Sequence, residues 1–166
     1  AFMLAKNNIS IINYLSAIFD INKQNKNGDT ELMLAFKSET SFEAIYFLCD
    51  TFKDKVNINL QNNNGYTALM FAAQHSTCTE SLRHLCLKFK DKIAINRQNH
   101  DGNTALMLAA QYNTNIAVIQ YLCNIFKGKI AIDRQNNDSH NALMLAARFN
   151  KNIQVTRYLC NLLIKT

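Results

Sequence analysis

Cysteine and histidine are the residues of this chain best suited to chemistry, because thiolates and imidazoles bind metals and act as nucleophiles or bases. The 166-residue sequence contains five cysteines and four histidines. Four of the cysteines recur at a spacing of 37 residues: Cys49, Cys86, Cys123 and Cys160. They occupy one position of a repeating unit, so we expect small core residues rather than metal ligands. Cys78 lies outside this series, in a break between two expected helices, and we expect an exposed thiol there.

The cysteine spacing also argues against disulfide bonds. Equivalent atoms of stacked helical units lie about 8–10 Å apart, whereas the Cα atoms of a disulfide lie within about 7 Å of each other. Unpaired thiols are typical of a reducing compartment. We therefore predict a cytoplasmic protein.

The histidines do not suggest a metal site or a catalytic set. His84 falls at a packing position of a helix, His75 ends another helix, and His100 and His140 fall in turns. A zinc site needs closely spaced ligands, and these residues belong to different units. No serine or cysteine nucleophile has a matching base, and no glycine-rich phosphate loop or carboxylate pair stands out. We predict no catalytic residues, no metal, no cofactor and no enzymatic activity for this chain.

The elements that position these residues form a 37-residue repeat. Each unit has a turn residue near its start: Gly28, Gly65, Gly102 and Ser139. Two positions later comes a residue suited to cap a helix: Thr30, Thr67, Thr104 and Asn141. An alanine-rich helix, a polar break and a second helix with apolar residues at three- and four-residue spacing follow in each unit.

One such unit cannot bury its own apolar face, but a stack of units can. We predict a single domain over residues 1–166, with a partial unit at 1–20 and full units at about 21–57, 58–94, 95–131 and 132–166. Neither end of the series looks like a polar capping unit. We therefore expect this chain to be a fragment of a longer protein.

The segment from Asn99 to Ala110 resembles the signature of the ankyrin-repeat family, in which Thr-Pro-Leu-His-x-Ala-Ala follows a glycine turn. The resemblance implies an all-α ankyrin-repeat solenoid of stacked helix-turn-helix units with short β-hairpin fingers. It also implies a concave groove, lined by the fingers and the first helices, where a partner protein binds. Such a protein is expected to be a monomeric scaffold.

Two departures from the family pattern are notable. Methionine stands where the family usually has histidine: Met33, Met70, Met107 and Met144. We expect packing to replace the hydrogen bonds that histidine makes between repeats. The period also exceeds the usual 33 residues, and the extra residues follow Phe52, Phe89 and Phe126, where we expect a longer second helix or a wider connector.

The residues that vary between units are the candidates for binding. They follow the turn glycine, end the first helix or occupy a turn, and if the resemblance holds they face the groove. The candidate partner-binding residues are Asp29, Tyr66, Gln74, His75, His100, Asp101, Asn103, Gln111, Tyr112, His140, Arg148 and Phe149. Tyrosine and arginine are enriched in binding hot spots. The alternative for Phe149 is that it covers the end of the core.

Lysines recur in the connectors between units and could form a basic edge. They are Lys53, Lys55, Lys90, Lys92, Lys127 and Lys129, in a chain with a formal net charge of +6. One interpretation is a solvated edge that complements the negative ends of helix dipoles. The other is a surface for nucleic acid, an acidic partner or an anionic membrane.

Three functional hypotheses follow. The first is a scaffold that binds another protein through the groove, and the second is a binder of nucleic acid or acidic surfaces through the lysines. The third is a recruiting arm of a larger enzyme.

No apolar run approaches the roughly 18 residues of a membrane span. The richness in Asn, Ile and Lys suggests an AT-rich genome, and ankyrin arrays of such organisms often act as effectors in the host cytosol.

Overall fold

The computed structural model describes residues 17–38, 42–77 and 79–164. In this part of the chain the four units each contribute two helices. The first helices are α2 (Glu31–Lys37), α4 (Ala68–His75), α6 (Ala105–Tyr112) and α8 (Ala142–Phe149). The second helices are α3 (Phe42–Thr51), α5 (Glu80–Phe89), α7 (Ile116–Ile125) and α9 (Ile153–Leu163). Cys78 lies outside the described residues, so the expectation of an exposed thiol there is not addressed.

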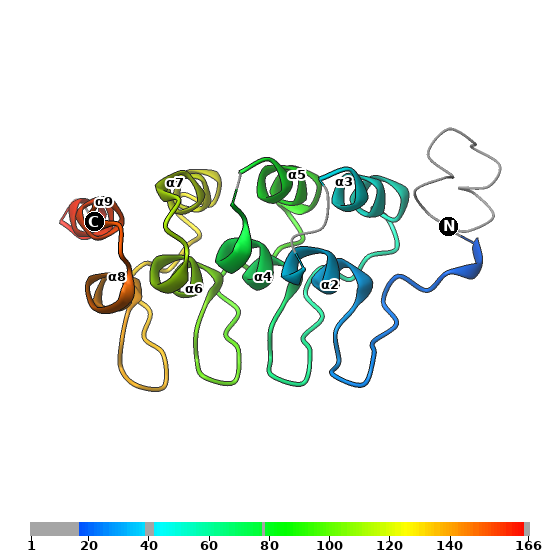
Figure 1. Ribbon diagram of the computed structural model, residues 1–166, viewed down its shortest axis with the longest axis horizontal. Coiled ribbons are helices and arrows are strands. Elements are labelled where there is room, and N and C mark those ends of the chain that lie inside the picture. Colours follow the sequence, from blue (N-terminus) through cyan, green and yellow to red (C-terminus); the bar gives the residue numbers. More distant parts are fainter. Residues whose placement is uncertain (1–16, 39–41, 78, 165–166) are drawn as a thin grey trace.

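The helix pairs stack side by side into a single row (Figure 1). The second helices α3, α5, α7 and α9 lie along one side of the row, and four loops project from the opposite side. The first helices α2, α4, α6 and α8 lie between them. We call these four loops the fingers and α2, α4, α6 and α8 the inner helices. The all-α stack predicted from the 37-residue repeat is confirmed.

Each inner helix begins where the sequence predicts a cap. The Thr67 hydroxyl accepts a hydrogen bond from the Met70 backbone N–H at 3.3 Å. The Met70 sulfur in turn accepts from the Thr67 N–H at 3.4 Å. The same reciprocal pair occurs at Thr30 and Thr104, whereas Asn141 caps α8 without a return bond. The methionines therefore take the place that Glu or Gln fills in a capping box.

The core runs along the whole row because small residues let the inner helices approach one another. Ala72, Ala73, Ala109 and Ala110 have no exposed surface. The ends of the second helices contribute large, fully buried side chains: Phe89 is the last residue of α5, and Phe52 and Phe126 directly follow α3 and α7. Burial of such residues between neighbours is the main stabilising contribution in a stack whose units share one core.

The fingers are tight loops rather than β-hairpins. The described residues contain no strand. In the first finger the Asn25 N–H donates to the Asp29 carbonyl at 3.0 Å, and the Gly28 N–H donates to the Asn25 carbonyl at 2.9 Å. Gly28 has a φ of 76°, and Ser139, at the equivalent position of the fourth finger, has a φ of 63°. The turns predicted from these residues are confirmed, but each closes with too few ladder bonds to make a strand.

The residues beyond the usual period form a turn after the second helix. In the connector after α3, the backbone N–H groups of Lys55 and Val56 donate to the Phe52 carbonyl at 2.9 and 2.8 Å. Lys92 and Ile93 repeat these bonds to Phe89. Three of the second helices have ten residues and α9 has eleven. The wider connector, rather than a longer helix, accommodates the extra residues.

Side-chain amides link equivalent segments along the stack in three places: successive connectors, successive fingers and successive breaks between helices. In the connectors, the Asn59 side chain donates to the Lys92 carbonyl at 2.7 Å and accepts from the Ala94 N–H at 2.8 Å. At the bases of the fingers, the Gln61 amide donates to the Gln98 carbonyl at 2.9 Å. Asn22 and Gln24 make the same donor bonds one unit earlier, and Asn96 and Gln98 make them one unit later.

The third place is the break between the helices of a unit. There the Asn113 amide donates to the carbonyls of Ala73 and Ser76, each at 3.0 Å, and Asn150 does the same one unit later. We call these three series the amide ladders. Met33, Met70 and Met107 are buried in the place of histidine, and Asn and Gln side chains add hydrogen bonds between repeats.

The cysteine series follows the core, with one exception. Cys49, Cys86 and Cys123 are free and buried, which confirms the prediction for them. Cys160 is free but exposed, so the prediction is wrong there. The reason is its position on α9, whose outer side has no further described helix against it (Figure 1). Met144 on α8 is 48% exposed for the same reason, whereas its counterparts Met70 and Met107 are buried.

Candidate partner-binding groove

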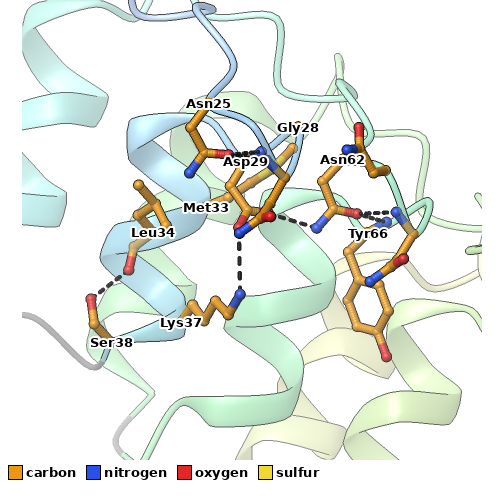
Figure 2. Close-up of polar contacts among 12 residues, drawn as sticks. Asn25, Gly28, Asp29, Met33, Leu34, Lys37, Ser38, Asn62 and Tyr66 are labelled. Carbon is orange, nitrogen blue, oxygen red and sulfur yellow. Dashed lines mark hydrogen bonds and ion pairs between the residues drawn. The ribbon is translucent and has the colours of Figure 1, made fainter.

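The fingers hold one another in register through buried polar side chains. Asp29 is 2% exposed, and its Oδ1 accepts a hydrogen bond from the Asn62 amide of the next finger at 2.6 Å. Figure 2 shows this bond together with those that Asn62 Oδ1 accepts from the backbone N–H groups of its own finger. Asn103 is buried as well and accepts from the Asn136 amide at 2.9 Å. Asp29 and Asn103 therefore join fingers and offer little surface to a partner.

In the first unit of the groove, a lysine side chain forms an ion pair with Asp29. The Lys37 ammonium lies 3.4 Å from Asp29 Oδ2 and 5.6 Å from the centre of the Phe71 ring. Figure 2 shows Lys37 reaching from α2 toward Asp29. This charge neutralises a carboxylate that would otherwise be buried without a counter-ion. Lys37 was not among the predicted site residues, although it stands at the variable position later occupied by Gln74, Gln111 and Arg148.

Aromatic rings continue from this ion pair along the inner helices. The Tyr66 and Phe71 rings are stacked with centroids 5.0 Å apart, and Phe71 is stacked with His75 at 6.2 Å. Burial raises the pKa of the Tyr66 phenol, and the charge of Asp101 and the neighbouring Tyr112 raise it further. Tyr66, Phe71 and His75 therefore form one row of stacked rings in the second unit.

The inner helices present their last residues to solvent toward the C-terminal end. Tyr112 is 54% exposed and Phe149 is 47% exposed. The Arg148 guanidinium lies 5.0 Å from the centre of the Phe149 ring. Exposed rings held on helices are a rigid contact surface, because few rotamers are lost when a partner binds.

The remaining candidates lie along the same surface. Gln74, Gln111 and His140 are half-buried, and His100 and Asp101 are exposed on the third finger. The Gln74 Oε1 atom is buried without a hydrogen bond. Most of the predicted residues thus lie on the fingers and at the ends of the inner helices, and Asp29 and Asn103 among them are buried.

The matching family model is described as ankyrin repeats in three copies, and it covers residues 1–98 and again residues 82–165. This chain belongs to the ankyrin-repeat family. Ankyrin repeats are generally protein–protein interaction modules. No curated protein matches the chain significantly, so family membership is the finding that bears on its role.

The ankyrin fold carries the predicted basic edge on its connectors. The side chains of Lys53, Lys55, Lys90, Lys92, Lys127 and Lys129 are all exposed. Their backbone is held by an amide ladder, since the carbonyls of Lys55, Lys92 and Lys129 accept from asparagines of the preceding connector. Asp54 and Asp91 stand between the lysines of the first two connectors and reduce their net charge.

A separate polar cluster joins α3 and α5, away from the ankyrin groove. His84 stacks on Tyr46 with ring centroids 3.9 Å apart, and its Nε2 lies 3.4 Å from Asp50 Oδ1. The same carboxylate oxygen forms an ion pair with Lys88. His84 thus occupies the packing position expected from the sequence. Among the described residues, no group of three histidine, cysteine or acidic side chains could hold a metal ion.

Within residues 17–38, 42–77 and 79–164, no helix has both the length and the apolar character of a membrane span.

Proposed function

We propose that this ankyrin stack is a scaffold that binds another protein through its concave groove. The observation that carries the proposal is the exposure of Tyr112 and Phe149 at the ends of α6 and α8. Other residues of these helices, such as Leu108 and Leu145, are buried in the core. Large aromatic side chains on a rigid surface, beside an arginine, have the composition of binding hot spots.

The experiment is a comparison of captured proteins between variants of the chain. The bait is the whole chain as wild type and with Tyr112→Ala plus Phe149→Ala. The matched control is Leu87→Ala, which removes an exposed aliphatic side chain from α5, outside the groove. A partner bound by the wild type and the control but lost with the aromatic pair supports the groove. A partner that binds all three baits equally contradicts it.

A second candidate surface is the basic edge, favoured by the exposure of all six lysines on connectors of fixed register. Its partner would be a nucleic acid or an acidic protein surface. Replacing Lys90, Lys92, Lys127 and Lys129 by Glu tests this candidate. Binding through phosphate contacts falls steeply as salt rises, so a partner lost in that variant and at high salt indicates the edge rather than the groove.

We also propose that the protein works in a reducing compartment such as the cytosol. Support comes from Cys49, Cys86, Cys123 and Cys160, all of which are free thiols. The redox state of these thiols in the protein isolated under alkylating conditions tests the point. Recovery of disulfide-linked chains would contradict it.

A further inference from the structure

The first unit of the groove shows how this surface binds a positive charge. Lys37 Nζ lies between a carboxylate oxygen of Asp29, at 3.4 Å, and the face of the Phe71 ring, at 5.6 Å from its centre. The carboxylate and the ring come from adjacent repeats, so the site is built across a joint of the stack. A carboxylate supplies a charge-assisted contact, and an aromatic face supplies a cation–π contact.

The next joint has a carboxylate and rings but no cation of its own. The position of Lys37 is taken by Gln74 and Gln111, which are neutral. The exposed carboxylate there is Asp101. Within the described part of the chain it forms no ion pair, and its Oδ2 accepts from the Asn99 amide at 3.4 Å.

Asp101 is held in place relative to Tyr66. Asn99 Oδ1 accepts from the Asp101 backbone N–H at 3.1 Å, which fixes the turn of the third finger. The His100 N–H donates to the Asn64 carbonyl of the second finger at 3.1 Å. In the sequence, Asp101 directly follows His100, and Tyr66 lies two residues after Asn64. The bond between the fingers therefore fixes the backbones of Asp101 and Tyr66 relative to each other. A Cβ on Gly65 would lie 2.8 Å from the His100 nitrogen, so the residues that directly precede Tyr66 and Asp101 are in close contact. Burial raises the pKa of the Tyr66 phenol, and the charge of Asp101 raises it further.

We propose that Tyr66 and Asp101 form a subsite for an arginine side chain of the partner protein. This inference rests on the proposed groove function. The planar guanidinium stacks on a tyrosine ring while its N–H groups donate to the Asp101 carboxylate, a combination that a lysine ammonium provides less well. An acidic partner residue is repelled here, and an apolar one leaves the carboxylate desolvated without a counter-charge.

The other end of the groove does not repeat this subsite. Arg148 occupies the equivalent variable position in the fourth unit and already covers the Phe149 ring. A second cation from the partner would meet a like charge there. The proposal therefore places the partner's arginine over the joint between the second and third units.

A peptide library displayed on phage and selected against the whole 166-residue chain tests the inference. We expect enriched peptides to share an arginine. In a synthetic copy of one such peptide, replacing that arginine by citrulline keeps the shape and removes the charge. We expect at least a tenfold loss of affinity for the wild type, but less than a twofold loss for Asp101→Asn, by the logic of a double-mutant cycle.

Asp138→Asn is the matched control, since Asp138 is the equivalent residue of the fourth finger. It should retain the full citrulline penalty. A penalty equally large in Asp101→Asn would overturn the arginine subsite. Enriched peptides that lack a shared arginine, yet lose binding with Tyr112→Ala plus Phe149→Ala, would overturn the subsite and leave the groove intact. If no enriched peptide depends on any groove residue, the groove itself is wrong.

Discussion

The side-chain amide of Asn113 donates to the backbone carbonyl of Ala73, one repeat earlier in the chain, at 3.0 Å. Asn113 is buried at the end of α6, and it also donates to Ser76 and accepts from the Asn115 N–H. The backbone N–H of Asn113 thus makes the last bond of its own helix, while its side chain orders the following break and binds the preceding repeat. The stability of the stack therefore depends on polar as well as apolar contacts.

Asn113→Ala should lower the free energy of unfolding by about 2 kcal/mol, because buried backbone groups lose their partners. Urea denaturation followed by circular dichroism measures the change. Asn124→Ala is the control, since Asn124 is exposed on α7, and its effect should stay within about 0.5 kcal/mol. Equal effects of the two substitutions would contradict the role assigned to Asn113.

Two glycines with the same backbone conformation allow the cost of a left-handed backbone to be measured apart from the cost of a steric clash. Gly65 and Gly128 both have a φ of 78°. A Cβ at Gly65 would lie 2.8 Å from the His100 nitrogen, whereas a Cβ at Gly128 meets nothing within 4 Å. Gly128→Ala should therefore cost about 1 kcal/mol from the left-handed conformation alone. Gly65→Ala should cost clearly more, as seen in thermal unfolding, and a smaller loss for Gly65→Ala would contradict the close packing of the fingers.

The cluster around His84 predicts a pH dependence of stability. Burial lowers the pKa of His84 below its ordinary value of 6.5; the Asp50 carboxylate raises it, and the Lys88 ammonium lowers it. The net direction is down, so the unfolded chain binds the proton more readily than the folded one. This contribution to stability is complete above pH 6.5 and is lost as the pH falls through the lowered pKa.

His84→Tyr removes the titrating group and is compatible with the position, because Tyr121 and Tyr158 occupy it in the next two repeats. Between about pH 7.5 and pH 5.5, the wild type should lose more unfolding free energy than this variant. Urea titrations at a series of pH values measure both. Identical pH profiles would show that His84 keeps its ordinary affinity for protons in the fold.

The four cysteines of the repeat should differ in reactivity. Burial raises the pKa of the Cys49, Cys86 and Cys123 thiols to about 12, so they have little thiolate at neutral pH. In a Cys78→Ser background, an aromatic disulfide reagent should modify Cys160 rapidly and the other three at the rate of unfolding. Mass spectrometry of the labelled peptides identifies each site. Rapid labelling of Cys86 would contradict its burial.

The parts of the fold that depend on local pattern were predictable. Gly65 and Thr67 indicate a turn and a helix start because their backbone and capping requirements are local. The exposure of Tyr112 and Phe149 followed from their register at the end of an inner helix. Cys160 was wrongly predicted as buried because identical residues at one repeat position have different neighbours along a stack.

The polar contacts between repeats were not predictable in the same way. Asn59 and Gln61 repeat in the sequence, but an amide in a loop has the same pattern whether it faces water or a neighbouring carbonyl. Asp29 was assigned to the binding surface because its position varies between units, and its burial depends on Asn62 of the next finger. Lys37 was left out of the predicted binding residues because the sequence does not show its contact with Phe71, whose ring belongs to another repeat.

The acceptors in the amide ladders are mostly main-chain carbonyls, such as those of Ala73, Lys92 and Gln98. Every amino acid carries this group, so a unit can be duplicated, deleted or exchanged by recombination without a matching change in its neighbour. The amide ladders are thus indifferent to most side chains of the adjoining unit. Lineages that carry such a gene are free to change the length of the array and the chemistry of its groove independently.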